Sequence, residues 1–251
     1  NHFNRDFIFG LINENNHRAR IFSKSDKLIY RSKVVAKMNY YELLPLNKYR
    51  IPKKYKFQTP QNNNDLQKAL DFINEHYKNH LLFRPLDIKY FESMIQSLPD
   101  FSLNNITILN EDDKLKGVAI TYNPINMVSL SITHMDFKSK IISNAIRVIN
   151  KFTGLLFSPP KEGEPINTLN VRFLAGGIVE RNILLRCVNN YANRNNIHTI
   201  SMLLDSRESI NIPNKLSYEF KSLIYSAFKE PFASKITLFE KHPVFFDISF
   251  S

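Results

Sequence analysis

Residues 169–205 constrain the fold most, because they predict a strand, a helix and a second strand in direct succession. LNVRFLA (169–175) is typical of a strand. From Glu180 onwards the apolar residues recur every three or four positions, as on a helix with one buried face, and HTISMLLD (198–205) predicts the returning strand. If both strands share a sheet, this unit of about 30 residues is a right-handed crossover.

Gly176 and Gly177 lie where the first strand meets the helix, in a chain with only six glycines. A helix N-terminus leaves backbone N–H groups unpaired and carries a positive partial charge, so it stabilises an anion such as a pyrophosphate. Arg181 could add a charge-assisted contact to that anion. The pair fits a tight turn with positive φ equally well, and Glu180 at the helix start would itself satisfy the dipole. Both interpretations, a phosphate site and a turn, stay open.

The rest of the chain alternates between helical and strand patterns and predicts an α+β protein with a mixed, mostly antiparallel sheet flanked by helices. Two regions carry explicit signals: Asp65 can cap a helix, and the polar turn between 104–109 and 117–123 indicates a hairpin. The further expected elements are one or two short helices in 3–24, one or two strands in 27–44, an exposed connection at 45–56, helices at 84–98, 139–152 and 214–228, and strands at 127–135, 234–241 and 243–250.

Composition excludes several classes of protein. The single Cys187 rules out an internal disulfide, and the seven scattered histidines show no zinc-ligand spacing, so we expect no metal and an inert, buried thiol. No run approaches the roughly 20 apolar residues that cross a bilayer, so we expect a cytoplasmic protein without a membrane partner. The net charge of +11 attracts polyanions, yet no helix clusters Arg and Lys on one face, so we do not expect sequence-specific nucleic-acid binding.

The order of elements from about 56 to 250 resembles the GNAT acyl-CoA transferase fold. In that family the strand, turn and helix at this place carry the acetyl-CoA pyrophosphate. LAGGIVERN (174–182) keeps two glycines but lacks the spaced glycines that are usual in the family. NHRARIFSKSDKLIY (16–30) is similar to a GNAT helix in which Asn contacts the cofactor: Asn16 matches, whereas Ser23 stands where the family often has a Tyr that protonates the departing thiolate.

The resemblance implies two GNAT-like units in tandem, similar to the HOOKLESS-type acetyltransferases. Residues 1–47 would be the closing helix and strands of a first unit, 48–56 a linker and 57–251 a second GNAT-like domain. The implied function is transfer of acetyl from acetyl-CoA, or of another acyl group from its acyl-CoA, to an amine on a small molecule or peptide, with a degenerate second domain. The alternative is a non-catalytic GNAT-like interaction module that binds a protein or RNA partner.

The same resemblance implies roles for individual residues. Phe173 and Leu174 would present the backbone of the cofactor strand to the acyl-CoA, beside Gly176, Gly177 and Arg181, and Asn16 would contact the cofactor. A catalyst of this kind needs a general base for the amine and an acid for the thiolate. His134 on the 127–135 strand is the candidate base, and Tyr225 on the 214–228 helix is the candidate acid. A packed histidine and a core tyrosine are the alternative interpretations of these two residues.

Overall fold

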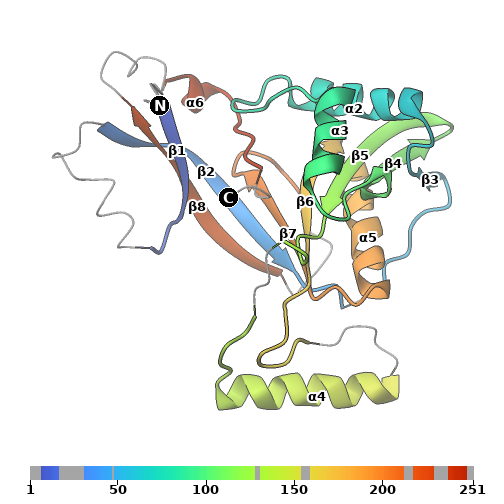
Figure 1. Cartoon of the computed structure of the whole chain (residues 1–251), viewed down its shortest axis with the longest axis vertical. Coiled ribbons are helices and arrows are strands. Elements are labelled where there is room, and N and C mark those ends of the chain that lie inside the picture. Colours follow the sequence, from blue (N-terminus) through green and yellow to red (C-terminus); the bar gives the residue numbers. More distant parts are fainter. Residues whose placement is uncertain are drawn as a thin grey trace.

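The computed structural model describes residues 7–16, 31–46, 48–127, 131–153, 159–211, 217–228 and 237–247. In this part of the chain eight strands form one sheet in the order β1-β8-β2-β7-β6-β5-β4-β3 (Figure 1). Neighbouring strands are antiparallel except β6 and β7, which run parallel. The expected α+β class, with a mostly antiparallel sheet flanked by helices, is therefore confirmed.

The elements have these bounds. The strands are β1 (Phe7–Asn13), β2 (Arg31–Leu43), β3 (Tyr55–Gln58), β4 (Ile106–Glu111), β5 (Lys114–Tyr122), β6 (Thr168–Gly176), β7 (Thr199–Asp205) and β8 (Ser217–Phe228). The helices are α2 (Asn63–Tyr77), α3 (Ile88–Ser97), α4 (Phe137–Thr153), α5 (Ile178–Arg194), α6 (Thr237–Lys241) and a short 3₁₀ turn, η1 (Leu103–Asn105).

Local signals explain where several elements begin. The side chain of Asn62 caps α2 by accepting from the N–H of Asp65 at 3.0 Å, so the cap is Asn62 and the expected cap Asp65 lies in the first turn. Such a cap stabilises a helix by about 1 kcal/mol. The hairpin between β4 and β5 turns through Asp112 and Asp113, whose φ angles of 49° and 57° suit a two-residue turn.

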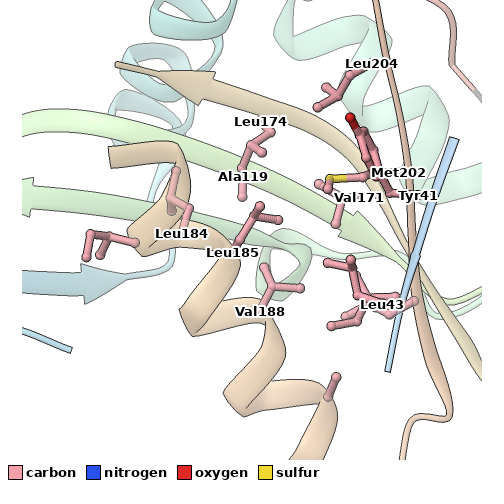
Figure 2. Close-up of a cluster of buried hydrophobic side chains, with 14 of the residues drawn as sticks. Tyr41, Leu43, Ala119, Val171, Leu174, Leu184, Leu185, Val188, Met202 and Leu204 are labelled. Atoms are coloured by element: carbon pink, nitrogen blue, oxygen red, sulfur yellow. The ribbon is translucent and has the colours of Figure 1, made fainter. Parts of the chain in front are cut away.

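Helices cover both faces of the β3 to β7 half of the sheet. Helices α2 and α3 bury one cluster of apolar side chains against β4, β5 and β6, and α5 buries a second cluster against the opposite face. Figure 2 shows the second cluster, in which Leu184, Leu185 and Val188 of α5 point toward Ala119 of β5 and Val171 of β6. The crossover predicted from 169–205 is therefore confirmed as β6, α5 and β7.

Two helices expected from the sequence are strands. Residues 7–13, within the expected 3–24 helices, form β1, while residues 17–30 lie outside the described residues. The expected 214–228 helix is wrong, because residues 217–228 form β8. β8 pairs along its whole length with β2 and also with β1, so the sheet satisfies its backbone and outweighs the helix-like local spacing.

Three expected strands are also wrong in their described parts. Residues 131–136 are irregular apart from one bridge between Ser131 and Pro165, and residues 237–241 form the helix α6. Residues 243–247 make a single bridge, between Leu81 and Val244. The remainder of 127–135 and of 243–250 falls partly outside the described residues. Alternating apolar residues predicted strands here. In the described part of these segments, however, pairing with other residues is limited to the two single bridges.

The residues around the expected linker pack on the rest of the molecule. β2 lies between β7 and β8, so residues before and after 48–56 build the same sheet. The chain that follows β2 runs along α5, where Asn193 donates to the carbonyl of Pro45 at 2.6 Å. The Asn190 side chain makes two hydrogen bonds with the backbone of Tyr49. Its Oδ1 accepts from the Tyr49 N–H at 2.7 Å, and its Nδ2 donates to the Tyr49 carbonyl at 2.9 Å. The division into two units stays a prediction.

Candidate functional site

The strands β6 and β7 part within the sheet. They hydrogen-bond as parallel neighbours only between Thr168–Val171 and Thr199–Met202. Beyond that point β6 continues beside β5, while β7 continues beside β2. The result is a wedge between residues 172–176 and 203–205, where the backbone groups on the β7 side of β6 need other hydrogen-bond partners.

A tyrosine from α2 supplies those partners. The hydroxyl of Tyr77 donates to the carbonyl oxygen of Leu174 and accepts from the N–H of Leu174, both at 3.2 Å. Both side chains are almost fully buried, with 2% exposure for Tyr77 and 1% for Leu174. Burial, followed by the charge of Glu208, raises the pKa of Tyr77 far above its ordinary value, so the hydroxyl stays protonated. The Tyr77 hydroxyl therefore satisfies both the N–H and the carbonyl oxygen of Leu174.

The segment 243–247 packs beside Tyr77 and also closes the wedge. Phe245 donates its N–H to the carbonyl of Leu81 at 2.9 Å and stacks its ring on Phe173 at 5.0 Å between ring centres. Val244 donates its N–H to the carboxylate of Asp205, at the end of β7, at 2.8 Å. A cavity of about 10 Å³ remains, which is about the room of one water molecule.

A buried ion pair holds this segment in place. The guanidinium of Arg172 on β6 contacts the carboxylate of Asp247 through Nε at 3.1 Å and Nη2 at 2.5 Å. The Arg172 side chain is fully buried, and its guanidinium also lies 5.9 Å from the ring centres of Phe101 and Phe173. Because a desolvated cation needs a charged partner, Asp247 and its segment are fixed to the wedge.

Four titratable side chains gather beside the wedge. Arg181 pairs with Glu208 at 2.6 Å between Nη1 and Oε2 and donates from Nη2 to the carbonyl of Ser209 at 2.9 Å. His80 Nε2 lies 3.5 Å from Glu208 Oε1, and the His76 ring stacks on the His80 ring. The side chains of Arg181, His80 and Glu208 are 7%, 10% and 12% exposed.

The charges of this cluster shift two pKa values. Burial of the Glu208 carboxyl acts to raise its pKa, but the neighbouring His80 imidazole and Arg181 guanidinium outweigh burial, so the pKa lies below its ordinary value. Burial, and next the charge of Arg181, lowers the pKa of His76 to about 4. Near neutral pH Glu208 is therefore ionised and His76 is neutral.

The glycine pair forms a tight turn. Gly176 has a φ of 138°, and a Cβ there would lie 3.0 Å from the carbonyl oxygen of Lys116, so this position requires glycine. Gly177 is the N-cap of α5, and a Cβ on it would collide with the Glu180 carboxylate. The positive φ that the turn interpretation requires is thus present, and an acidic side chain lies at the helix start. The pyrophosphate role stays a prediction.

The expected cofactor residues do not all point into one open site. Phe173 and Leu174 lie on β6 at the wedge, as the crossover predicted, and both are buried. Arg181 is engaged by Glu208 and Ser209. Asn16 is exposed in the turn after β1, and β8, β2 and β7 separate β1 from β6. Its expected helix, 16–30, falls from residue 17 onwards outside the described residues.

The two expected catalytic residues lie elsewhere than their predicted elements. His134 precedes α4 in an irregular segment, where its side chain is 80% exposed and lies 3.6 Å from Glu162. Its expected position on a central strand is therefore wrong. Tyr225 lies on β8 and not on a helix, with β2 and β7 between it and β6. Among the described residues, no group of three or more His, Cys, Asp and Glu could hold a metal ion.

Sequence reasoning missed the residues that meet at the wedge. Tyr77 is the last residue of α2 and lies 97 positions before Leu174, and Asp247 lies 75 positions after Arg172. Glu208 stands in a short turn, Ser206–Ser209, with no recognisable motif. No local pattern marks these partners, because only the tertiary fold brings them together.

Cys187 was expected to be inert, and burial raises the pKa of its thiol to about 11.

Comparison with known proteins gives the fold. No family model and no curated protein matches the sequence. Among solved structures, a GCN5-related N-acetyltransferase from Sphaerobacter thermophilus is similar, with a TM-score of 0.53 and 11% sequence identity. The chain has the GNAT fold. The match covers 89% of this chain and 60% of that protein, so this chain spans less than two thirds of its neighbour's length.

Two further neighbours are more distant. A probable N-acyltransferase from Enterococcus faecalis matches with a TM-score of 0.46 and 8% identity over 87% of this chain and 44% of that one. Saccharomyces cerevisiae N-myristoyltransferase with bound myristoyl-CoA and inhibitors matches with a TM-score of 0.47 and 8% identity over 80% of this chain and 52% of that one.

Among the described residues, no helix has both the length and the apolar character needed to span a bilayer.

Proposed function

We propose that this chain belongs to an N-acyltransferase-type protein, and that its 57–251 domain keeps the GNAT architecture with a closed, non-catalytic cleft. One observation carries the proposal: the Tyr77 hydroxyl bonds to both backbone groups of Leu174 in the wedge between β6 and β7. Transfer of acetyl from acetyl-CoA to an amine would then be the task of another unit. The GNAT-like unit that we expect to end within 1–47 is the candidate.

The closed wedge makes acyl-CoA entry costly. An acyl-CoA that used the Leu174 backbone would have to displace Tyr77 and the ring of Phe245. Moving segment 243–247 would also separate Arg172 from Asp247, and breaking a buried pair costs about 3–5 kcal/mol. That cost corresponds to a loss of affinity of roughly 10² to 10³-fold. The domain would therefore serve as an interaction module, and the net charge of +11 favours an acidic protein or RNA partner.

A thermal-shift titration of the 251-residue chain with acetyl-CoA and with CoA tests the proposal. A ligand present at 100 times its Kd stabilises a protein by about 2.7 kcal/mol, so binding is readily detected. We expect no saturable shift. A saturable shift that Val179→Glu abolishes and Ile95→Glu preserves would place an acyl-CoA at the start of α5 and refute the closed cleft. Both side chains are exposed, Val179 on α5 and Ile95 on α3, so both variants should fold.

A second candidate function has its own observation. His80 and Glu208 form an imidazole–carboxylate pair beside the wedge, with 3.5 Å between Nε2 and Oε1. Such a pair can act as a general base that deprotonates an attacking amine. This domain would then transfer the acyl group itself after segment 243–247 moves aside. Amine-dependent release of CoA thiol, lost in His80→Gln at unchanged Tm, would favour this candidate over the closed module.

A further inference from the structure

Helix α4 exposes an apolar face to solvent. Figure 1 shows α4 at one end of the molecule, apart from the sheet and from the helices that cover it. Phe137, Ile141 and Val148 are 77%, 51% and 56% exposed. At about 100° per residue these three positions fall within about 40° of one another, so they form one stripe along the helix. This stripe therefore does not face the protein core.

One flank of α4, beside the apolar stripe, is held by the protein itself. Lys140 pairs with Glu162 at 2.6 Å, and Arg147 donates from Nη2 to the carbonyl of Pro159 at 3.2 Å. Ser143, further round the helix from the stripe, is buried. Residues 159–162 thus hold this flank of the helix and leave the apolar stripe exposed.

The charges of α4 select the kind of surface that can cover the stripe. The helix contains four basic residues, Lys138, Lys140, Arg147 and Lys151, and no acidic residue. A second copy of α4 would bring the basic residues of both helices together, with Glu162 as an acidic partner for Lys140 only, which disfavours a helix pair between two copies. A nucleic acid would satisfy the cations but not the apolar stripe. An anionic lipid surface satisfies both, because apolar side chains enter the acyl boundary while Lys and Arg reach the headgroups.

We propose that α4 is a membrane-surface helix that lies in the headgroup region of an anionic bilayer. The apolar stripe of Phe137, Ile141 and Val148 enters the interface, and Lys138, which is exposed on the other border of the stripe, contacts the acidic headgroups. This inference does not depend on the proposed function. It revises the expectation of no membrane partner, which rested on the lack of a spanning segment, because an interfacial helix lies in the plane of the membrane and needs no such segment.

The chain has no tryptophan, so a single introduced tryptophan reports on its own surroundings. We expect the emission of Phe137→Trp to shift to the blue with vesicles of phosphatidylcholine and phosphatidylserine, and to stay unshifted with phosphatidylcholine alone. The matched control is Val179→Trp, at an exposed apolar position on α5, and its emission should not respond to either vesicle. A Phe137→Trp signal that ignores anionic vesicles would overturn the proposal.

Vesicle co-sedimentation of the full chain separates the apolar and charged contributions. Ile141→Asn should weaken binding to the phosphatidylserine vesicles by about tenfold through loss of buried apolar area. Lys138→Gln should weaken it by about fivefold, and raising the salt should weaken it further. Equal binding to both kinds of vesicle would contradict an anionic site. A dimer in sedimentation velocity that Ile141→Asn converts to monomer would show that a second copy covers the stripe, and would also overturn the proposal.

Discussion

Replacing Tyr77 with Phe tests the central feature of the candidate site, because it removes one oxygen atom and leaves the ring in place. The Tyr77 hydroxyl bonds to both the N–H and the carbonyl oxygen of Leu174 at 3.2 Å, in a region that is almost fully buried. Without the hydroxyl, one buried donor and one buried acceptor lose their partner. Each such group costs about 1–3 kcal/mol.

We expect Tyr77→Phe to lower the free energy of unfolding by about 2 kcal/mol, at the lower end of the sum for two groups. The reason for the lower value is the adjoining cavity of about 10 Å³, which together with the vacated space can hold a water molecule that restores part of the bonding. For a chain of this size the expected decrease in Tm is about 4–8 °C. Urea denaturation at neutral pH measures the change, with the slope m expected to stay constant.

Tyr122→Phe is the matched control. Tyr122 is buried like Tyr77, with 1% exposure, but its hydroxyl donates a single hydrogen bond, to the carbonyl of Pro99 at 3.1 Å. We expect a loss of about 1 kcal/mol or less for this variant. If Tyr77→Phe costs no more than Tyr122→Phe, the Tyr77 hydroxyl does not saturate the backbone of β6, and the reasoning that closes the cleft fails.

Three further predictions concern the cluster and the turn beside the wedge. Arg181→Met leaves the Glu208 carboxylate buried without its closest partner, so we expect the free energy of unfolding in urea to fall by about 3 kcal/mol. Adding Glu208→Gln should reduce this loss, and additive effects of the two substitutions would contradict the pair. Gly176→Ala forces an L-residue to a φ of 138° and should cost about 2 kcal/mol, whereas Gly177→Ala, at −67°, should cost less; equal Tm values would disprove the strain. Burial lowers the folded pKa of His76 to about 4, so between that value and the unfolded pKa near 6.5 the unfolded chain binds more protons. Stability should then fall as the pH drops through that window, by up to about 2 kcal/mol after solvent screening, and His76→Gln should flatten the profile between pH 7 and pH 5.

The sequence by itself determined the elements whose signals are local. The apolar periodicity of 178–194 required a helix with one buried face, and the strand patterns on either side made β6 and β7. The polar turn between β4 and β5 is where the sequence placed it, and α2 starts near the expected position, although its cap is Asn62 and not Asp65. These features follow from hydrogen bonds and side-chain spacing within a few residues, so a single sequence locates them to within about one turn.

The tertiary structure decided the site. β8 became a strand because β1 and β2 pair with it, although its own spacing suited a helix. The wedge is closed by Tyr77 and by segment 243–247, which lie 97 and about 75 residues from their partners on β6. α4 is the predicted helix, but the stripe of Phe137, Ile141 and Val148 is exposed, and residues 159–162 hold the flank beside it. The physical reason is that residue spacing specifies which face of an element is apolar, whereas only the packing of distant segments determines what covers that face.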